Sequence, residues 1–379
     1  MSDRAPRKSG RVTPKSTRPS PQVPATDTPA PIVPLEALQN ILGDLDALRN
    51  SDPLGIEIRA SFAWGIMQRE DGLELFRAVL ATLTDGLRRG SPEARDYMRM
   101  LATVAETGVA KRFAQLLRQA AIIALPPRWV NHAGRAVVEH AYIYEYELGD
   151  TYTVNLICRY PDAERQHELV AFIDASLGWF ADIGAFSEVS PIDDDLGEVH
   201  RREISLAEAR THIERALGFA PALFEHPDAR KIVARLRLIA HYAESLPSGF
   251  ELPERQPLTD DERDVIVDAF LASSHGQALI ESAEFSDGQE VARDLVRTFV
   301  VIAHNILDGK PLRLTPQSMG LLSLALLSEE PETRVALPSG SDDEQVALMK
   351  QVMRAFVPYA HELNGWGDRY LADTLTAID

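Results

Sequence analysis

The chain has 379 residues, more than one hydrophobic core usually serves, and its 45% hydrophobic and 25% charged residues are ordinary for a globular protein. No apolar run approaches the ~20 residues of a membrane span and no secretory signal peptide is recognisable, so we expect a cytoplasmic protein. The net charge of -18 is uneven, because residues 1–34 hold six cations and two anions and leave about -22 for the rest. Such an acidic body repels nucleic acid and anionic lipid.

The first 34 residues form a basic, proline-rich arm. They include eight prolines and no aromatic residue, so they cannot bury enough apolar surface to offset the entropy lost on ordering. The composition therefore predicts disorder. Two interpretations stay open for the arm, a solubilising tail or a tether that makes weak contact with nucleic acid or with the acidic face of a partner.

Residues 35–130 have the pattern of an N-terminal helical unit. Apolar side chains recur at spacings of three and four, and Asp52-Pro53 and Ser91-Pro92 are typical helix starts. The pattern predicts paired antiparallel helices joined by short loops.

The segment 139–160 changes to strand periodicity. Bulky residues occupy alternate positions from Tyr142 to Leu148 and again from Tyr152 to Cys158, which predicts a β-hairpin. A three-residue loop would pair Leu148 with Tyr152 and keep all bulky residues on one buried face, including a structural thiol at Cys158. The opposite face, solvated or facing a ligand, would then carry Glu145, Glu147, Thr153, Asn155 and Arg159.

The hairpin needs further cover, because an isolated pair of strands is marginal in water. Residues 169–173 are a plausible third strand, which extends the predicted sheet region over 131–205. Residues 206–379 are expected to form a C-terminal helical unit with a linker near 247–257, and Thr259 with Glu262 forms a capping box. The expected fold is predominantly α, of the α+β class, with bundle-like helical units flanking one small antiparallel sheet.

Several fragments of the sequence belong together, namely Ser51–Leu54, Pro127–Trp129, Leu148–Asp150, His167–Gly178, Phe270–Ser274 and Gly309–Pro316. In these fragments the chain resembles a group of mostly helical bacterial proteins from high-GC genomes that has no assigned activity. The resemblance covers most of residues 35–379 and implies a shape without a chemistry.

The common catalytic signatures are missing from the sequence. It contains no Gly-x-Ser-x-Gly elbow, no phosphate loop ending in Lys-Ser/Thr and no dinucleotide-binding glycine motif. The single cysteine rules out an intrachain disulfide and a cysteine zinc cluster. We therefore expect no cofactor, and the sequence leaves open whether the protein is an enzyme.

Four residues are candidates for a site between the sheet and the helices. Asp174 and Asp182 flank Trp179, and two carboxylates near an aromatic ring suit acid–base work if one of them is desolvated. Arg313 precedes a helix start and suits anion binding. The structural alternatives are a capping role for Asp174 and a surface ion pair for Arg313.

An acidic stretch offers the only candidate metal site. Asp193, Asp195 and His200 lie within eight residues, and a hard cation binds carboxylate oxygens. Their spacing is not that of the calcium-binding loop, and a solvated acidic loop is the alternative.

Taken together, these patterns favour a non-catalytic protein-interaction or scaffold protein with an unknown protein partner and no membrane contact. One alternative is a small-ligand binder or enzyme that uses Asp174, Asp182, Trp179 and Arg313. The other is contact with nucleic acid through residues 1–34.

Overall fold

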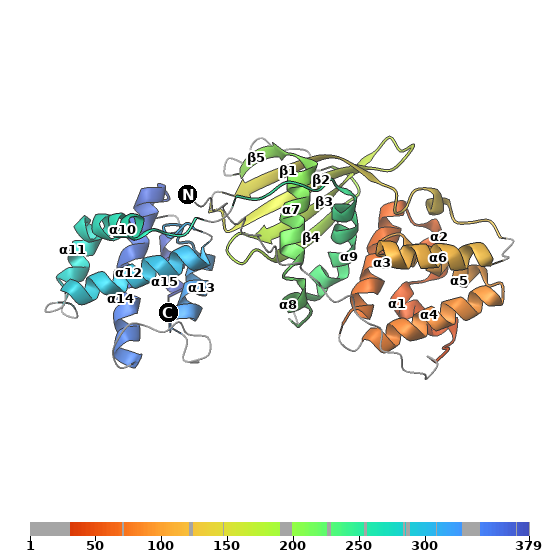
Figure 1. Cartoon of the computed structure of the whole chain (residues 1–379), viewed down its shortest axis with the longest axis horizontal. Coiled ribbons are helices and arrows are strands. Elements are labelled where there is room, and N and C mark those ends of the chain that lie inside the picture. Colours follow the sequence, from red (N-terminus) through yellow and green to blue (C-terminus); the bar gives the residue numbers. More distant parts are fainter. Residues whose placement is uncertain are drawn as a thin grey trace, which may run out of the picture.

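A computed structural model describes residues 31–69, 72–120, 124–146, 148–189, 199–225, 229–253, 256–282, 285, 289–307, 309–327, 342–368 and 370–378. Figure 1 shows N-terminal helices at one end of the long axis, a sheet with its own helices in the middle, and C-terminal helices at the other end. The predicted mostly helical α+β fold with one antiparallel sheet is confirmed. None of the described helices combines the length and apolar character needed to cross a membrane.

The predicted basic arm lies largely outside the described residues, and so does the nucleic-acid contact expected of it. The described chain begins at residue 31. Val33 donates its backbone N–H to Thr82 Oγ1 at 3.0 Å. It also packs against the hydrophobic core shared by the N-terminal helices and the middle of the molecule, which we call the first core. Val33, near the end of the predicted arm, therefore binds to the N-terminal helices.

The N-terminal helices begin where the sequence predicts. Asp52 Oδ1 accepts a hydrogen bond from the Gly55 N–H at 2.7 Å, and Ser91 Oγ accepts one from the Ala94 N–H at 3.1 Å, so each caps the helix that follows. The elements are η1 (Leu35–Leu38), α1 (Gln39–Leu42), α2 (Leu45–Asn50), α3 (Pro53–Met67), α4 (Gly72–Arg88), α5 (Pro92–Ala102), α6 (Thr107–Gln119) and η2 (Arg128–Asn131).

The middle of the molecule is a five-stranded antiparallel sheet with the order β4-β3-β2-β1-β5. The predicted hairpin and third strand are both present in it. The strands are β1 (Val137–Tyr146), β2 (Thr151–Arg159), β3 (Gln166–Asp174), β4 (Phe180–Phe186) and β5 (Val199–Ile204).

The predicted register of the hairpin is wrong. The last pair before the turn is Glu145 with Tyr152, and residues 147–150 connect β1 to β2, so the connection is longer than three residues. Ile143 pairs with Val154 on the buried face, beside the buried Cys158. Small and branched side chains fit beneath the helices, whereas the tyrosines keep their hydroxyl groups near water on the other face.

That tyrosine face also carries polar residues that were expected to be solvated. Tyr142 pairs with Asn155, and the Arg201 guanidinium carbon lies 3.9 Å from the centre of the Tyr142 ring. Asn155 is nevertheless buried and donates to Glu168 Oε1 at 2.6 Å. Large neighbouring side chains exclude water there, and the paired polar groups compensate one another. Glu147 lies outside the described residues.

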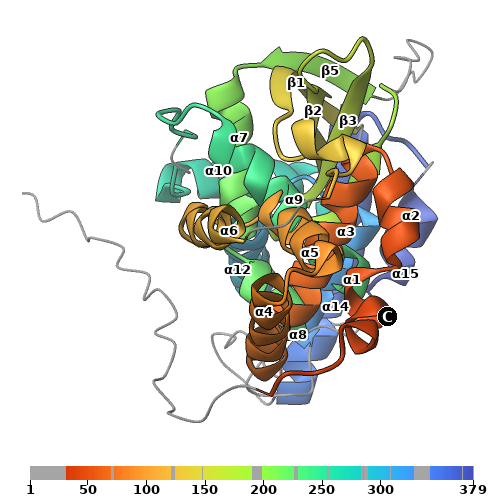
Figure 2. The same ribbon diagram turned by 90° about the vertical axis from the view of Figure 1, so that its right-hand side faces the viewer.

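Three helices follow the sheet, namely α7 (Leu206–Leu217), α8 (Ala220–Glu225) and α9 (Arg230–Ser245). Helix α7 packs on β1 and β2, α9 packs on β4, and α8 packs on α9. Figure 2 looks from the N-terminal helices and shows α9 behind α3. A Cβ atom at Gly65 of α3 would lie 2.7 Å from the Val233 carbonyl oxygen of α9, so this glycine permits the close approach of the helices. The N-terminal helices, the sheet and α7–α9 therefore share one hydrophobic core.

The C-terminal helices follow the segment 247–258 and have a core of their own. The predicted capping box is confirmed, with Glu262 N–H donating to Thr259 Oγ1 at 3.2 Å and Thr259 N–H donating to the Glu262 carboxylate at 3.0 Å. The helices are α10 (Asp260–Ala272), α11 (Ser274–Ile280), α12 (Gln289–Ile306), α13 (Pro316–Leu327), α14 (Asp342–Asn364) and α15 (Leu371–Thr376).

Candidate functional site

A polar junction joins the sheet to the C-terminal helices, and Asp174 lies in it. Asp174 ends β3 and is 3% exposed. Its Oδ1 accepts hydrogen bonds from the backbone N–H groups of Ser176 at 2.8 Å and Leu177 at 2.7 Å, and its Oδ2 accepts one from the Gln317 side-chain amide. The Oδ1 atom therefore stabilises the β3–β4 turn, and the Oδ2 atom stabilises the start of α13.

The β1–β2 turn brings a second carboxylate to the junction. Asp150 Oδ1 accepts a hydrogen bond from the Thr315 hydroxyl, and the Asp150 carbonyl accepts one from the Ala175 N–H at 2.7 Å. Burial raises the pKa of the Asp150 carboxyl to about 6, the Thr315 hydrogen bond opposes this shift, and the nearby charge of Asp174 adds to it. The sequence placed Asp150 in a turn and gave no sign that α13 would cover it.

Arg313 packs on the same turn, on the side of Gly149. A Cβ atom at Gly149 would lie 1.9 Å from the Arg313 Nη2, and the glycine has φ +64°, in the left-handed region. The turn therefore presents bare backbone to the guanidinium group. The charge of Arg313 also lowers the pKa of Asp150, although less than burial raises it.

The start of α13 is fixed by reciprocal hydrogen bonds. Thr315 N–H donates to Ser318 Oγ at 2.7 Å, and Ser318 N–H donates to Thr315 Oγ1 at 3.1 Å. Thr315 thus caps α13 and contacts Asp150 with the same hydroxyl group. Because one hydroxyl group makes both contacts, the start of α13 lies against the β1–β2 turn of the sheet.

The structure brings Asp174 and Arg313 to one junction and leaves Asp182 apart from it. Asp182 is exposed on β4, where its Oδ1 accepts from the backbone N–H of Ile183 at 2.7 Å. Trp179 is half-buried and packs against the first core. Within the described part of the chain, no hydrogen bond joins Asp182 to Asp174.

The candidate metal ligands Asp193 and Asp195 lie outside the described residues. His200 is exposed on β5, opposite Glu145 of β1. Among the described residues there is no group of three or more histidine, cysteine or acidic side chains placed to hold a metal ion.

Beside the junction lies a pocket of about 1020 Å³, which we call the linker pocket. Its walls come from α7, residues 252–253 and 256–258, α10, the end of α12 and the loop 309–311. Most of the lining is apolar, and its charged residues are Asp261 and Glu262 of α10 together with Arg215 and Lys310. The lining residues are Arg215, Leu252, Pro253, Gln256, Pro257, Leu258, Asp261, Glu262, Val265, Ile266, His304, Gly309, Lys310 and Pro311.

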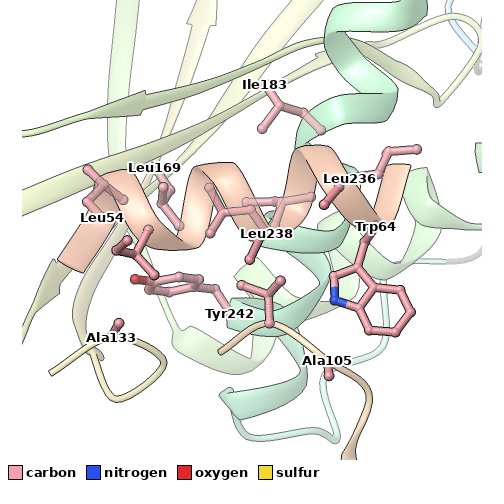
Figure 3. Close-up of a cluster of buried hydrophobic side chains, with 14 of the residues drawn as sticks. Leu54, Trp64, Ala105, Ala133, Leu169, Ile183, Leu236, Leu238 and Tyr242 are labelled. Carbon is pink, nitrogen blue, oxygen red and sulfur yellow. The ribbon is translucent and has the colours of Figure 1, made fainter. Parts of the chain in front are cut away.

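A separate group of titratable side chains is buried in the first core. Glu57 of α3 has no exposed surface, and its carboxylate accepts from the Gly134 N–H at 2.6 Å and the Tyr242 hydroxyl at 2.7 Å. The Tyr242 oxygen also lies 3.0 Å from His167 Nε2. Figure 3 shows Tyr242 among buried apolar side chains, including Leu169 and Leu238.

Burial determines the protonation of this group. It raises the pKa of Glu57 to about 7 against the opposing effect of its hydrogen bonds, and it lowers the pKa of His167 to about 4. His167 is therefore neutral near pH 7. Because Glu57 has no exposed surface, the network serves the packing of α3, β3 and α9 and offers no open site for a substrate.

Comparisons with protein families, with curated proteins and with solved structures found no significant match.

The junction is expected to weaken as the pH rises. Because the folded state raises the pKa of Asp150 from 3.8 to about 6, its full stabilising contribution is present below pH 3.8 and is lost as the pH passes through 6. Asp150→Asn keeps an acceptor for Thr315 without the charge. The decrease in the free energy of unfolding between pH 5 and pH 8 should therefore be smaller in this variant than in the wild type, by about 1–2 kcal/mol. Denaturant unfolding of both proteins at the two pH values measures this difference.

The matched control is Asp182→Asn, which removes the same charge from an exposed carboxylate. It should leave the pH dependence of stability as in the wild type. An Asp150→Asn protein with the wild-type pH dependence would show that the Asp150 carboxyl does not titrate in this window.

Proposed function

We propose that the protein is a non-catalytic interaction protein that holds an apolar, basic segment of a partner protein in the linker pocket. The observation that carries the proposal is the pocket itself, which lies between the sheet-bearing core and the C-terminal core and is lined by both. Its volume and mostly apolar walls suit the burial of several side chains of a bound segment.

The charge of the protein supports a basic partner. Outside residues 1–34 the chain carries a net charge near -22, whereas within the lining of the pocket Arg215 and Lys310 balance Asp261 and Glu262. Opposite charge on a partner speeds its encounter with this surface, and apolar anchors then determine how long it stays.

The arrangement of the candidate carboxylates also supports binding over acid–base catalysis. The oxygens of Asp174 hold a turn and Gln317, while Asp182 is on an exposed part of β4. Acid–base chemistry requires both groups within reach of one reacting atom.

Selection of displayed peptides against the full chain tests the proposal. Apolar peptides with basic flanks should be enriched, and Val265→Asp should weaken their binding at least about tenfold, because a charge would enter the apolar wall. Val265 is 68% exposed, so the substitution leaves the core of the C-terminal helices intact.

Val291→Asp is the control, because Val291 is 49% exposed on α12 and does not line the pocket. It should bind the selected peptides as the wild type does. Enrichment of acidic peptides, or equal binding by Val265→Asp and the wild type, would contradict the proposed function.

A further inference from the structure

A second cavity, which shares no lining residue with the linker pocket, lies among the N-terminal helices and α9. It is open to solvent, has a volume of about 570 Å³ and is lined by α5, α6, η2 with the turn that follows it, and the end of α9. We call it the α6 cavity. Leu117, Trp129, Val130 and several alanines give it apolar walls. This size and lining are typical of a small-molecule site.

Positive charge predominates in the α6 cavity. Arg99, Lys111 and Arg135 line it, and Glu244 is the one acidic residue among its lining side chains. Glu244 is held by Arg237, whose Nη1 and Nη2 lie 2.9 Å and 3.1 Å from its two carboxylate oxygens. The three cations of the cavity are therefore not neutralised by its own carboxylate.

The nearest carboxylate outside the lining is already shared. Asp96 Oδ1 lies 3.9 Å from the Arg99 Nη1, but Asp96 binds Arg49 at 3.1 Å and Arg95 at 2.9 Å. One negative charge thus faces three guanidinium groups. For Lys111 and Arg135, no ion pair with any described residue is present.

Two buried donors in the lining have no acceptor. The indole Nε1 of Trp129, a residue that is only 3% exposed, and the Nη1 of Arg99 make no hydrogen bond with the described residues. Leaving a buried donor unpaired costs about 1–3 kcal/mol, so such atoms normally have partners. The cavity therefore has an excess of donors and of positive charge at the same place.

From this combination we infer that the α6 cavity binds a small organic anion, with a carboxylate or phosphate group and an apolar body. The anionic group accepts hydrogen bonds from Arg135 and Lys111, two exposed cations of the lining. The apolar body lies against Trp129 and Leu117. No step of chemistry is required, so this is a binding site.

Calorimetric titration of the full chain with benzoate, phenyl phosphate, inorganic phosphate and the neutral benzyl alcohol tests the inference. Benzoate or phenyl phosphate should bind at least about tenfold more tightly than benzyl alcohol, and the stronger of the two identifies the preferred anionic group. Inorganic phosphate, which lacks the apolar body, should bind more weakly than phenyl phosphate.

Arg135→Gln and Lys111→Gln should each weaken binding of the preferred anion by about tenfold, because each removes a charge-assisted contact from an exposed position. The control is Arg165→Gln, which removes the same charge from a side chain that is 86% exposed beside Glu188. The inference is overturned if no anion binds, if benzyl alcohol binds as tightly as the anions, or if the two cavity variants retain wild-type affinity. None of these results bears on peptide binding in the linker pocket, which lies elsewhere in the fold.

Discussion

Replacing Glu57 with alanine is expected to lower the free energy of unfolding by about 3–5 kcal/mol. The substitution removes the acceptor for two buried donors, the Gly134 N–H and the Tyr242 hydroxyl, and leaves a void between α3 and α9. Both donors then stay buried without a partner. Denaturant unfolding at pH 6, followed by circular dichroism, measures the loss.

The amide variant Glu57→Gln separates hydrogen bonding from charge. Below pH 4.5 the carboxyl is neutral in both states, whereas between pH 4.5 and about 7 the folded protein holds a proton that the unfolded chain releases. The wild type should therefore lose up to about 3 kcal/mol as the pH rises through 7. The amide variant lacks this loss, so it should be less stable than the wild type at pH 5 and similar to it at pH 8.

The titration of Asp150 also makes the free energy of unfolding depend on pH. This dependence should remain in the Glu57→Gln protein and disappear in the double variant that also carries Asp150→Asn. Equal pH dependence in the wild type and Glu57→Gln would show that Glu57 does not change protonation on folding. A loss below about 1 kcal/mol in Glu57→Ala would show that water replaces the missing acceptor.

Helix starts were predictable because their causes are local. Asp52, Ser91 and Thr259 each cap the helix that follows them, and a cap depends on a side chain and on backbone groups two or three residues away. The third strand was predictable for a similar reason, because its apolar run is short and bounded.

The register of the hairpin was not predictable from the bulk of its side chains. Tyr142 and Tyr144 looked like core residues, but Ala141 and Ile143 fill the buried face, where α7 packs closely on the sheet. Only the covering helices determine which face has room for a large ring. A pattern within one hairpin carries no information about that cover.

Polar contacts between segments that are far apart in the sequence were also not predictable. Asp150 and Thr315 are 165 residues apart, and Glu57 and Tyr242 are 185 apart. The sequence does contain one indication that Glu57 is buried, because this residue lies between Ile56 and Ile58 at the start of an apolar helix. A carboxylate there predicts a buried partner, but only the fold identifies it.

Gly276→Ala is expected to destabilise the C-terminal helices selectively, by about 2–4 kcal/mol. A Cβ atom at Gly276 would lie 2.2 Å from the Phe270 carbonyl oxygen and 2.6 Å from the Leu271 Cα, so the backbone between α10 and α11 must move. Gly276 is buried and belongs to the C-terminal helices, whose core shares no buried apolar residue with the first core.

Hydrogen exchange resolved along the chain distinguishes the two cores. In Gly276→Ala, amides of α10–α14 should lose protection while those of α3 and α9 keep it, because the described residues of the two cores form separate apolar clusters and meet through hydrogen bonds such as those of Asp150 and Asp174. Gly320→Ala is the control, since no atom outside its own helical turn lies within 4 Å of a Cβ at that position, and alanine there should stabilise α13 by up to about 1 kcal/mol. Equal loss of protection in α3 and α12 would mean that the two cores unfold as one, and that the junction at Asp150 and Asp174 couples them more strongly than its few hydrogen bonds indicate.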